Sequence, residues 1–196
     1  MRTAWFNSAN EFDAHLGRLL RRYAFVNHRN VDSFAEAFAL HLRAGAVPRD
    51  PFSLLPLLGV KLERALLSPA SRAIWVRAQD SYAIHYSQYE ARCSARFSLW
   101  HEVFEIVAAN PRFPSLLAPP WKERLADRFA ASVLMPQWAV RRELVRFASN
   151  RAGLVAVLAD RFGVSQSAMR RRLRETAPEG YRARPYRSEE ARLLQG

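Results

Sequence analysis

The segment His101-Glu102-Val103-Phe104-Glu105 places three side chains capable of metal and acid–base chemistry within five residues. Residues four apart lie on the same face of a helix, so His101 and Glu105 can hold one metal ion. Glu102 then lies beside them as a general base for a water molecule at that ion. This is the geometry of the HExxH zinc helix, with glutamate in place of the second histidine. The structural alternative is an ordinary helix in which Glu105 pairs with an arginine and His101 packs in the core.

A third carboxylate follows at a suitable distance along the chain. Glu123 lies 18 residues after Glu105 and opens the segment ERLADRFAASVLMP, which has helical apolar spacing. A carboxylate from a helix after a proline-rich loop would complete a site of three protein ligands. We therefore expect His101, Glu105 and Glu123 to bind Zn2+ and Glu102 to be catalytic. The oxygen donors also admit Mn2+ or Fe2+.

The elements that must position these residues are mainly helices. From apolar spacing we expect two helices over 8–42 and further helices over 51–58, 96–108, 121–135 and 136–149. Asp32 or Ser33 is the expected N-cap of the second helix, and Asp50 that of the third. Three short stretches with strand character, at 60–64, 73–78 and 82–86, are separated by Ser-Pro-Ala-Ser and Gln-Asp-Ser turns and predict a small antiparallel sheet.

Residues 153–175 have the pattern of a helix, a Gly163-Val164-Ser165 turn and a second helix capped by Ser165. In a DNA-binding helix-turn-helix, the second helix would direct side chains toward bases (Gln166, Ser167, Arg170) and toward phosphates (Arg171, Arg172, Arg174). The alternative is a helical hairpin that packs on the core and shapes the cleft.

Three segments, taken in order, resemble the ImmA/IrrE family of bacterial metallopeptidases. They are RFSLWHEVFE, ERLADRFAASVLMP and LADRFGVSQSAMRRRL, and the resemblance covers roughly residues 50–175. It implies that His101 is the first metal ligand, Glu102 the general base and Glu123 the downstream carboxylate ligand. Two positions depart from the family pattern. Trp100 stands where the family usually has alanine, and Glu105 stands where it has the second histidine.

The patterns and the resemblance together predict an α+β fold, namely a mainly helical, zincin-like metallopeptidase domain with a small antiparallel sheet and a C-terminal helix-turn-helix-like segment. The expected parts are an N-terminal helical segment (1–48), a metallopeptidase-like core (49–150), the helix-turn-helix-like segment (151–175) and a basic tail (176–196). The resemblance implies an endopeptidase whose protein substrate is a helix-turn-helix repressor, cleaved to release stress-response or mobile-element genes. The alternative is a non-catalytic relative that binds DNA or a partner protein through Gln166, Arg170, Arg171 and Arg174.

Glu105 changes the charge expected at the site. With His101 neutral and both glutamates ionised, the ligands cancel the +2 of the metal, whereas two histidines and one glutamate leave +1. A lower residual charge makes the water at the ion less acidic, so hydrolysis should be slower than in a His-His-Glu site.

The chain is strongly basic because of its arginines. Its 196 residues include 30 Lys and Arg against 18 Asp and Glu, giving a formal net charge of +12, and only Lys61 and Lys122 are lysines. This surplus is typical of a protein with an acidic partner such as nucleic acid, or of arginine-rich codon usage. The single cysteine, Cys93, suits a reducing compartment. The sequence has neither an export signal nor a long apolar stretch, so we expect a cytoplasmic protein with no membrane partner.

Overall fold

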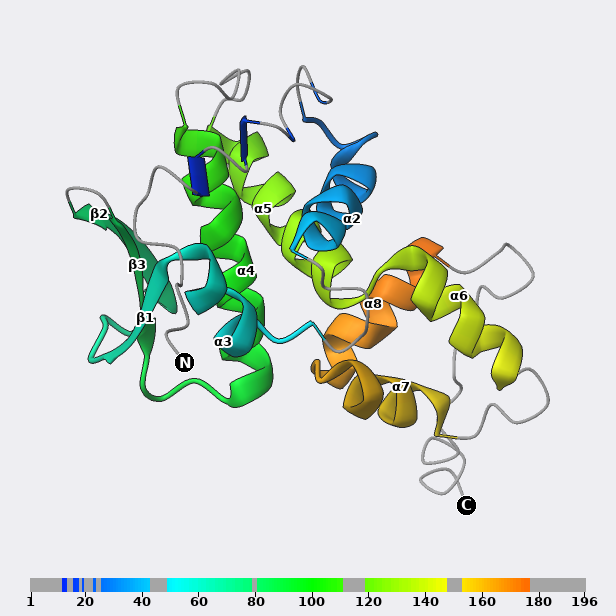
Figure 1. The fold of residues 1–196 in the computed structure, drawn as a ribbon. Coiled ribbons are helices and arrows are strands. Elements are labelled where there is room, and N and C mark those ends of the chain that lie inside the picture. The colour runs from blue at the N-terminus through cyan, green and yellow to red at the C-terminus, as the bar shows by residue number, and fades with distance from the viewer. Residues whose placement is uncertain are drawn as a thin grey trace, which may run out of the picture.

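The computed structural model has an α+β fold with one small sheet (Figure 1). The strands are β1 (Val60–Ala65), β2 (Ala73–Ala78) and β3 (Ser81–Ser87). The helices are α2 (Val31–His41), α3 (Pro51–Leu54), a 3-10 turn (Pro56–Leu58), α4 (Arg92–Ala109), α5 (Pro119–Leu134), α6 (Gln137–Arg146), α7 (Leu154–Phe162) and α8 (Gln166–Thr176). The structure describes residues 12–13, 16–17, 19, 23, 26–42, 49–78, 81–110, 119–147 and 153–176. Most of the first expected helix and nearly all of the expected basic tail lie outside these residues. No helix in the described ranges is long and apolar enough to cross a membrane.

The sheet is mixed, with β3 at its centre. β2 pairs with β3 in antiparallel register, but β1 pairs with β3 in parallel, so the prediction of an antiparallel sheet is wrong for β1. The physical reason is that the most buried strand, β3, takes the central position, so β1 pairs with a strand that runs in its own direction. Tyr82, Ala83 and Ile84 of β3 are all buried, which favours the central position for this strand. Ile74 and Val76 are exposed on β2, which forms an edge.

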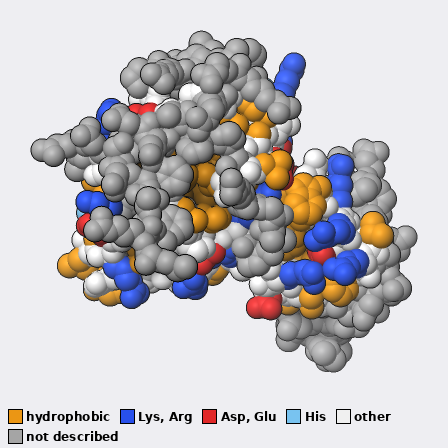
Figure 2. Space-filling view, viewed as in Figure 1, with side chains coloured by type: hydrophobic (Ala, Val, Ile, Leu, Met, Phe, Trp, Pro, Cys, Tyr) orange, Lys and Arg blue, Asp and Glu red, His pale blue; other side chains and the backbone are white. Residues whose placement is uncertain are grey.

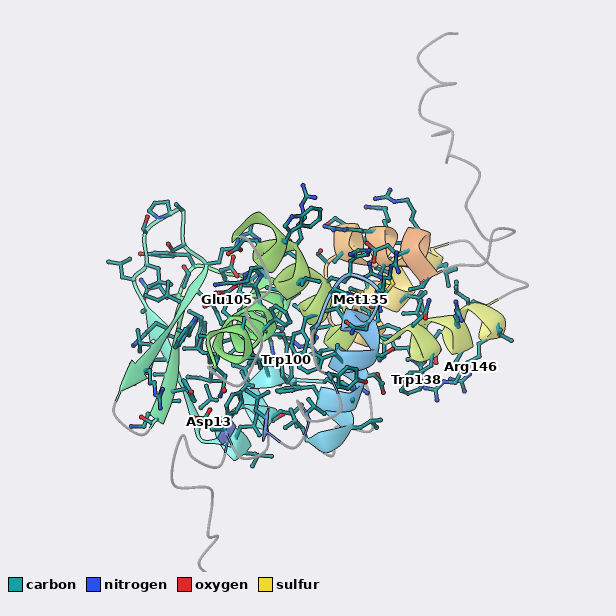
Figure 3. The ribbon with its side chains drawn as sticks, turned by 90° about the horizontal axis from the view of Figure 1, so that it is seen from above. Asp13, Trp100, Glu105, Met135, Trp138 and Arg146 are labelled. Carbon is teal, nitrogen blue, oxygen red and sulfur yellow. The ribbon has the colours of Figure 1, made fainter. Side chains whose placement is uncertain are left out.

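Helix α4 lies between the sheet on one side and α2 and α5 on the other (Figure 1). It is buried on several faces, which explains why apolar residues do not form a single stripe along it. Trp100 is fully buried, and its ring lies 6.4 Å from that of Phe38 in α2. The indole Nε1 donates a hydrogen bond to the Arg49 carbonyl at 3.3 Å. Trp100 therefore fills the interior between α4 and its neighbours (Figure 3).

Two predicted helix caps have other roles. Helix α2 begins after Asn30, so the expectation of Asp32 or Ser33 as its N-cap is wrong. Asp32 lies in the first turn, and its carboxylate accepts a hydrogen bond from Arg128 at 2.6 Å. Asp50 is the N-cap residue of α3, as predicted, but its side chain makes no capping hydrogen bond and pairs instead with arginines at the start of α4. In both cases an arginine distant in sequence competes successfully for the carboxylate.

Helices α7 and α8 confirm the predicted helix, turn and helix. The expected cap is also confirmed, because Ser165 Oγ accepts a hydrogen bond from the Ala168 N–H at 3.2 Å. The turn is fixed to α4 by Arg96, which is only 4% exposed and donates through Nη1 to the Phe162 carbonyl at 2.9 Å. Gly163 follows with a left-handed φ of 62°. This segment is therefore attached to the core at its turn.

We expect Gly163→Ala to destabilise the protein more than Gly153→Ala. Both glycines have left-handed φ values, 62° and 68°, so alanine strains the backbone by about 1 kcal/mol at either position. A methyl group at Gly163 would also clash with Arg96 Nη1, whereas at Gly153 it would meet nothing within 4 Å. Urea denaturation should show a further loss of about 2 kcal/mol for Gly163→Ala. Equal losses would contradict the anchoring role of Arg96.

Candidate metal centre

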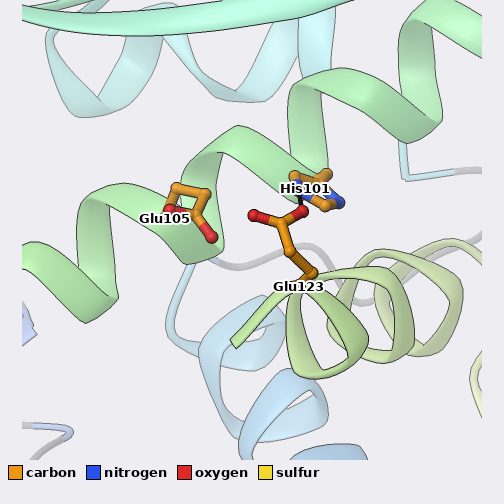
Figure 4. A group of neighbouring side chains, drawn as sticks. All are labelled: His101, Glu105 and Glu123. Atoms are coloured by element: carbon orange, nitrogen blue, oxygen red, sulfur yellow. Dashed lines mark ion pairs between the residues drawn. The ribbon is translucent and has the colours of Figure 1, made fainter. Parts of the chain in front are cut away.

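The three predicted metal ligands come together between α4 and α5 (Figure 4). His101 and Glu105 lie one turn apart on α4, and Glu123 comes from the beginning of α5. One ligand atom from each residue lies within 4.8 Å of the other two. His101 Nε2 is 3.3 Å from Glu123 Oε2. The cluster thus offers one nitrogen and two carboxylate donors.

Asp127 orients the ring of His101. Its Oδ1 lies 3.0 Å from His101 Nδ1, which leaves Nε2 directed toward Glu123. Metal-binding histidines commonly donate their second ring nitrogen to a carboxylate in this way. Asp127 follows Glu123 by four residues on α5, so both project from the same face. Asp127 was not among the site residues predicted from the sequence, although this spacing would have indicated it.

Two cationic side chains pair with the carboxylates of the cluster. Lys122 Nζ pairs with Glu105 Oε2, so the partner of Glu105 is a lysine and not the arginine considered from the sequence. His101 lies between Asp127 and Glu123, and only a protonated imidazole can donate to carboxylates on both sides. Burial lowers the pKa of His101, but the hydrogen bond with Asp127 and the surrounding negative charges outweigh burial and raise it overall. Binding of a cation at Nε2 would therefore release a proton.

The burial of Glu105 and the hydrogen bonding of its carboxylate indicate whether these residues fit a metal ion. Its side chain is buried, at 8% exposed, and Oε1 has no hydrogen-bond partner among the residues described. A buried carboxylate oxygen without a donor costs about 1–3 kcal/mol, which a cation at this position would recover. One imidazole and two carboxylates are a donor set that Zn2+, Mn2+ and Fe2+ accept. The residues therefore fit a divalent ion.

Glu102 lies beside the cluster and contacts an edge of the sheet. Its carboxylate accepts a hydrogen bond from the backbone N–H of Trp75 in β2. Among the described strands β2 pairs with β3 alone, and Trp75 lies opposite Ile84 at a position where its N–H points away from β3, toward the unpaired side of the strand. Burial raises the pKa of Glu102 to about 7; the charges of Glu105 and Glu123 also raise it, and His101 lowers it. A carboxyl group with a pKa near neutrality can both accept and release a proton.

Comparison with known proteins gives a likeness in fold. No protein-family model matches the chain, and no curated protein sequence matches it. Among solved structures, it is similar to a Mycobacterium tuberculosis transcriptional regulator, with 15% sequence identity and a TM-score of 0.55. The match covers 88% of this chain and 54% of that protein, so the chain spans about half of its structural neighbour's length. At this identity the similarity shows the fold alone.

The predicted nucleic-acid-binding residues lie on the exposed side of α8. These residues are Gln166, Arg170, Arg171 and Arg174. Arg172 was also expected to face phosphates, but this is wrong, because it is only 2% exposed. Its Nε donates to the carbonyl of Met135, which lies beside α8 (Figure 3), at 2.8 Å. One face of α8 therefore packs on the core, as the hairpin alternative expects.

We expect Asp127→Asn to weaken metal binding by about 10–100-fold. The asparagine amide retains the shape of the side chain but loses the charge that favours the correct orientation of His101. Competition with a fluorescent chelator measures the affinity, and Asp160→Asn on the exposed surface of α7 is the matched control. An unchanged affinity in Asp127→Asn would show that His101 is not held for metal binding.

Proposed function

We propose that this chain is a metal-dependent endopeptidase, similar to the ImmA/IrrE proteins, with a zincin-like site. The observation that carries the proposal is the approach of three donor atoms, from His101, Glu105 and Glu123, to within 4.8 Å beside the perturbed carboxyl of Glu102. The proposed ion is Zn2+, with Mn2+ and Fe2+ as alternatives for this oxygen-rich donor set. A divalent cation there would supply Lewis-acid activation of water and of the scissile carbonyl.

Glu102 is the proposed general base and general acid. It takes a proton from water as the oxygen forms a bond to the carbonyl carbon, and it passes that proton to the amine as the C–N bond breaks. In the metal-free protein, burial raises the pKa of Glu102 to about 7, so this carboxyl group can hold a proton near neutral pH. Asp127 keeps the His101 ring in the orientation required for binding and is therefore a positioning residue.

The unpaired edge of β2 is the proposed docking position for the substrate. An extended segment could add to this edge as a further strand, which would bring its backbone close to Glu102, since Trp75 of β2 already contacts that carboxylate. Strand addition at this edge requires a substrate that presents an extended segment of backbone. The proposed substrate is a helix-turn-helix transcriptional repressor whose cleavage releases stress-response or mobile-element genes.

Lys122 bears on the charge of the proposed site. With glutamate in place of a second histidine, the three ligands and a divalent ion sum to zero, and the ammonium group paired with Glu105 restores +1 nearby. The ammonium group of Lys122 would favour loss of a proton from the attacking water and would weaken the binding of a divalent ion.

We therefore expect Lys122→Gln to bind Zn2+ about tenfold more tightly and to hydrolyse peptides about tenfold more slowly. Chelator competition and peptide cleavage measure the two effects. Lys61, on the exposed face of β1, is the chain's other lysine, so Lys61→Gln is the matched control. Unchanged affinity and unchanged rate in Lys122→Gln would contradict this role.

A peptide library made from a bacterial proteome tests the proposed activity on many candidate sequences at once. The Zn2+-loaded protein should cleave a restricted set of them, identified by mass spectrometry. The same library should remain intact with Glu102→Gln or with chelator-treated protein. Identical cleavage patterns in all three samples would mean that the activity does not belong to this site.

A second candidate function, a non-catalytic regulator that binds DNA or a partner protein, is favoured by the charge of residues 137–176. This stretch has nine arginines and three acidic residues, so its charge of +6 is half of the chain's total. Lys and Arg side chains gather beside hydrophobic ones over α6 and α7 (Figure 2). The structural neighbour is called a transcriptional regulator. If this candidate is correct, Arg170→Ala combined with Arg171→Ala should weaken retention on duplex DNA and reduce its salt dependence.

A further inference from the structure

A cleft of about 1030 Å3 lies between α5 and α8, and none of the three metal ligands lines it. Its walls carry five arginines from different parts of the chain: Arg72, Arg124, Arg128, Arg171 and Arg172. The carboxylates in the walls are those of Asp127, which is bound to His101, and Glu175, which pairs with Arg171 and Arg172. Asp32 pairs with both Arg128 and Arg172, and Glu90 pairs with Arg72, so five guanidinium groups share three carboxylates. The cleft therefore has an excess of positive charge, concentrated on two helices that face each other across it.

Two of these arginines have binding capacity that the chain does not use. Arg124 has no carboxylate within ion-pair distance among the described residues, and its guanidinium lies 5.2 Å from the centre of the Trp121 ring. Arg172 is 2% exposed, and its Nη1 pairs with Asp32 at 3.2 Å. Its Nη2 is buried, with no acceptor in the described part of the chain. An unsatisfied buried guanidinium nitrogen is unfavourable, so an anion in the adjacent cleft would be stabilised by the charge of Arg172.

The same cleft has an apolar part. The apolar side chains that line the cleft come from four parts of the fold and are Phe97, Leu125, Met135 and Val164. The indole of Trp121 also lines the cleft, at its rim. Trp121 is 54% exposed, so the face of its ring that Arg124 does not cover can receive a flat group. A cleft of this size is typical of sites for organic molecules of drug or nucleotide size. The ligand should therefore combine an anionic group with an aromatic or apolar one.

We propose that this cleft binds a small organic phosphate of nucleotide size. Guanidinium groups from α5 (Arg124) and from α8 (Arg171) hold the phosphate, since their planar donors match its oxygens, and the paired Arg128 and Arg172 add positive charge beside it. The aromatic part of the ligand lies against Trp121 and the apolar floor. Such a ligand joins α8 to α5, the helix that carries Glu123 and Asp127. The inference goes beyond the proposed peptidase and does not depend on it, because no metal ligand takes part.

Titration of the full chain with ADP, followed by calorimetry and tryptophan fluorescence, tests this proposal. The variant Arg124→Gln with Arg171→Gln should bind ADP at least tenfold more weakly. The control, Arg142→Gln with Arg170→Gln, removes the same charge from exposed arginines outside the cleft and should change affinity less than twofold. Trp121→Phe should lose most of the fluorescence change. Inorganic phosphate should compete weakly, and adenosine should not bind detectably.

Three results would overturn the proposal. The first is the absence of saturable ADP binding by wild-type protein. The second is an equal loss of affinity in the two double variants, which would indicate attraction to the general surface charge. The third is displacement of ADP by duplex DNA whose own binding depends on Arg124 and Arg171, which would make the cleft a nucleic-acid surface. Thermal unfolding of each variant verifies that the fold is retained.

Discussion

Glu102→Gln is expected to lower kcat/KM for peptide hydrolysis by about 10²–10⁴-fold while leaving the metal content unchanged. Glutamine has nearly the same shape but cannot accept a proton from water. The three ligands are untouched, so the ion should still bind. The measurements are cleavage of the peptides selected from the library and metal content of the same preparation. Cleavage at the wild-type rate would exclude Glu102 as the general base.

The same substitution should change how stability depends on pH in the chelator-treated protein. The pKa of Glu102 is about 7 in the folded protein against 4.5 for the unperturbed group, so the folded state holds this proton more tightly than the unfolded one. The contribution of Glu102 to the free energy of unfolding is full below about pH 4.5 and is lost as the pH rises to about 7, a change of about 3 kcal/mol. Glutamine has no such ionisation. The difference in unfolding free energy between Glu102→Gln and wild type should therefore favour the variant more at pH 8 than at pH 4. An equal difference at the two pH values would contradict the raised pKa of Glu102.

Trp100→Ala is expected to destabilise the protein by about 3–5 kcal/mol, as is usual when a fully buried tryptophan is truncated. The loss combines an empty volume beside Phe38 with the missing hydrogen bond to the Arg49 carbonyl. Domains of this kind have a total stability of only about 5–15 kcal/mol, so partial unfolding at 37 °C is expected.

Urea denaturation followed by circular dichroism measures this effect. Trp121→Ala is the matched control, since that side chain is 54% exposed and its removal should cost less than about 1 kcal/mol. A loss below 1 kcal/mol for Trp100→Ala as well would mean that the interior at α4 tolerates the alanine that the ImmA/IrrE pattern has there.

The features that follow from local spacing were predictable from the sequence. His101 and Glu105 share a face of α4 because they lie four residues apart, and Glu123 joins them because α5 packs against α4. The turn at Gly163 and the cap at Ser165 are also local signals. Each of these depends on residues close together in the chain or on two neighbouring helices.

The features that depend on distant partners were not predictable in this way. The parallel pairing of β1 with β3 follows from which strand is most buried in the complete fold. Asp32 failed as a helix cap because arginines about 100 and 140 residues later bind its carboxylate. Lys122 is adjacent to Glu123 in sequence, but its pairing with Glu105 depends on how α5 is placed against α4. A pattern in one sequence does not show which distant residues come into contact.

The metal content of untagged protein purified without chelator is the most direct test of the central claim. Plasma mass spectrometry should find about one Zn2+, Mn2+ or Fe2+ per chain in the wild type and almost none in Glu105→Ala, because that substitution removes a ligand whose Oε1 has no other partner among the described residues. Absence of bound metal in the wild type, even after incubation with each ion, would contradict the account and leave the cluster as three ion pairs within a regulatory protein.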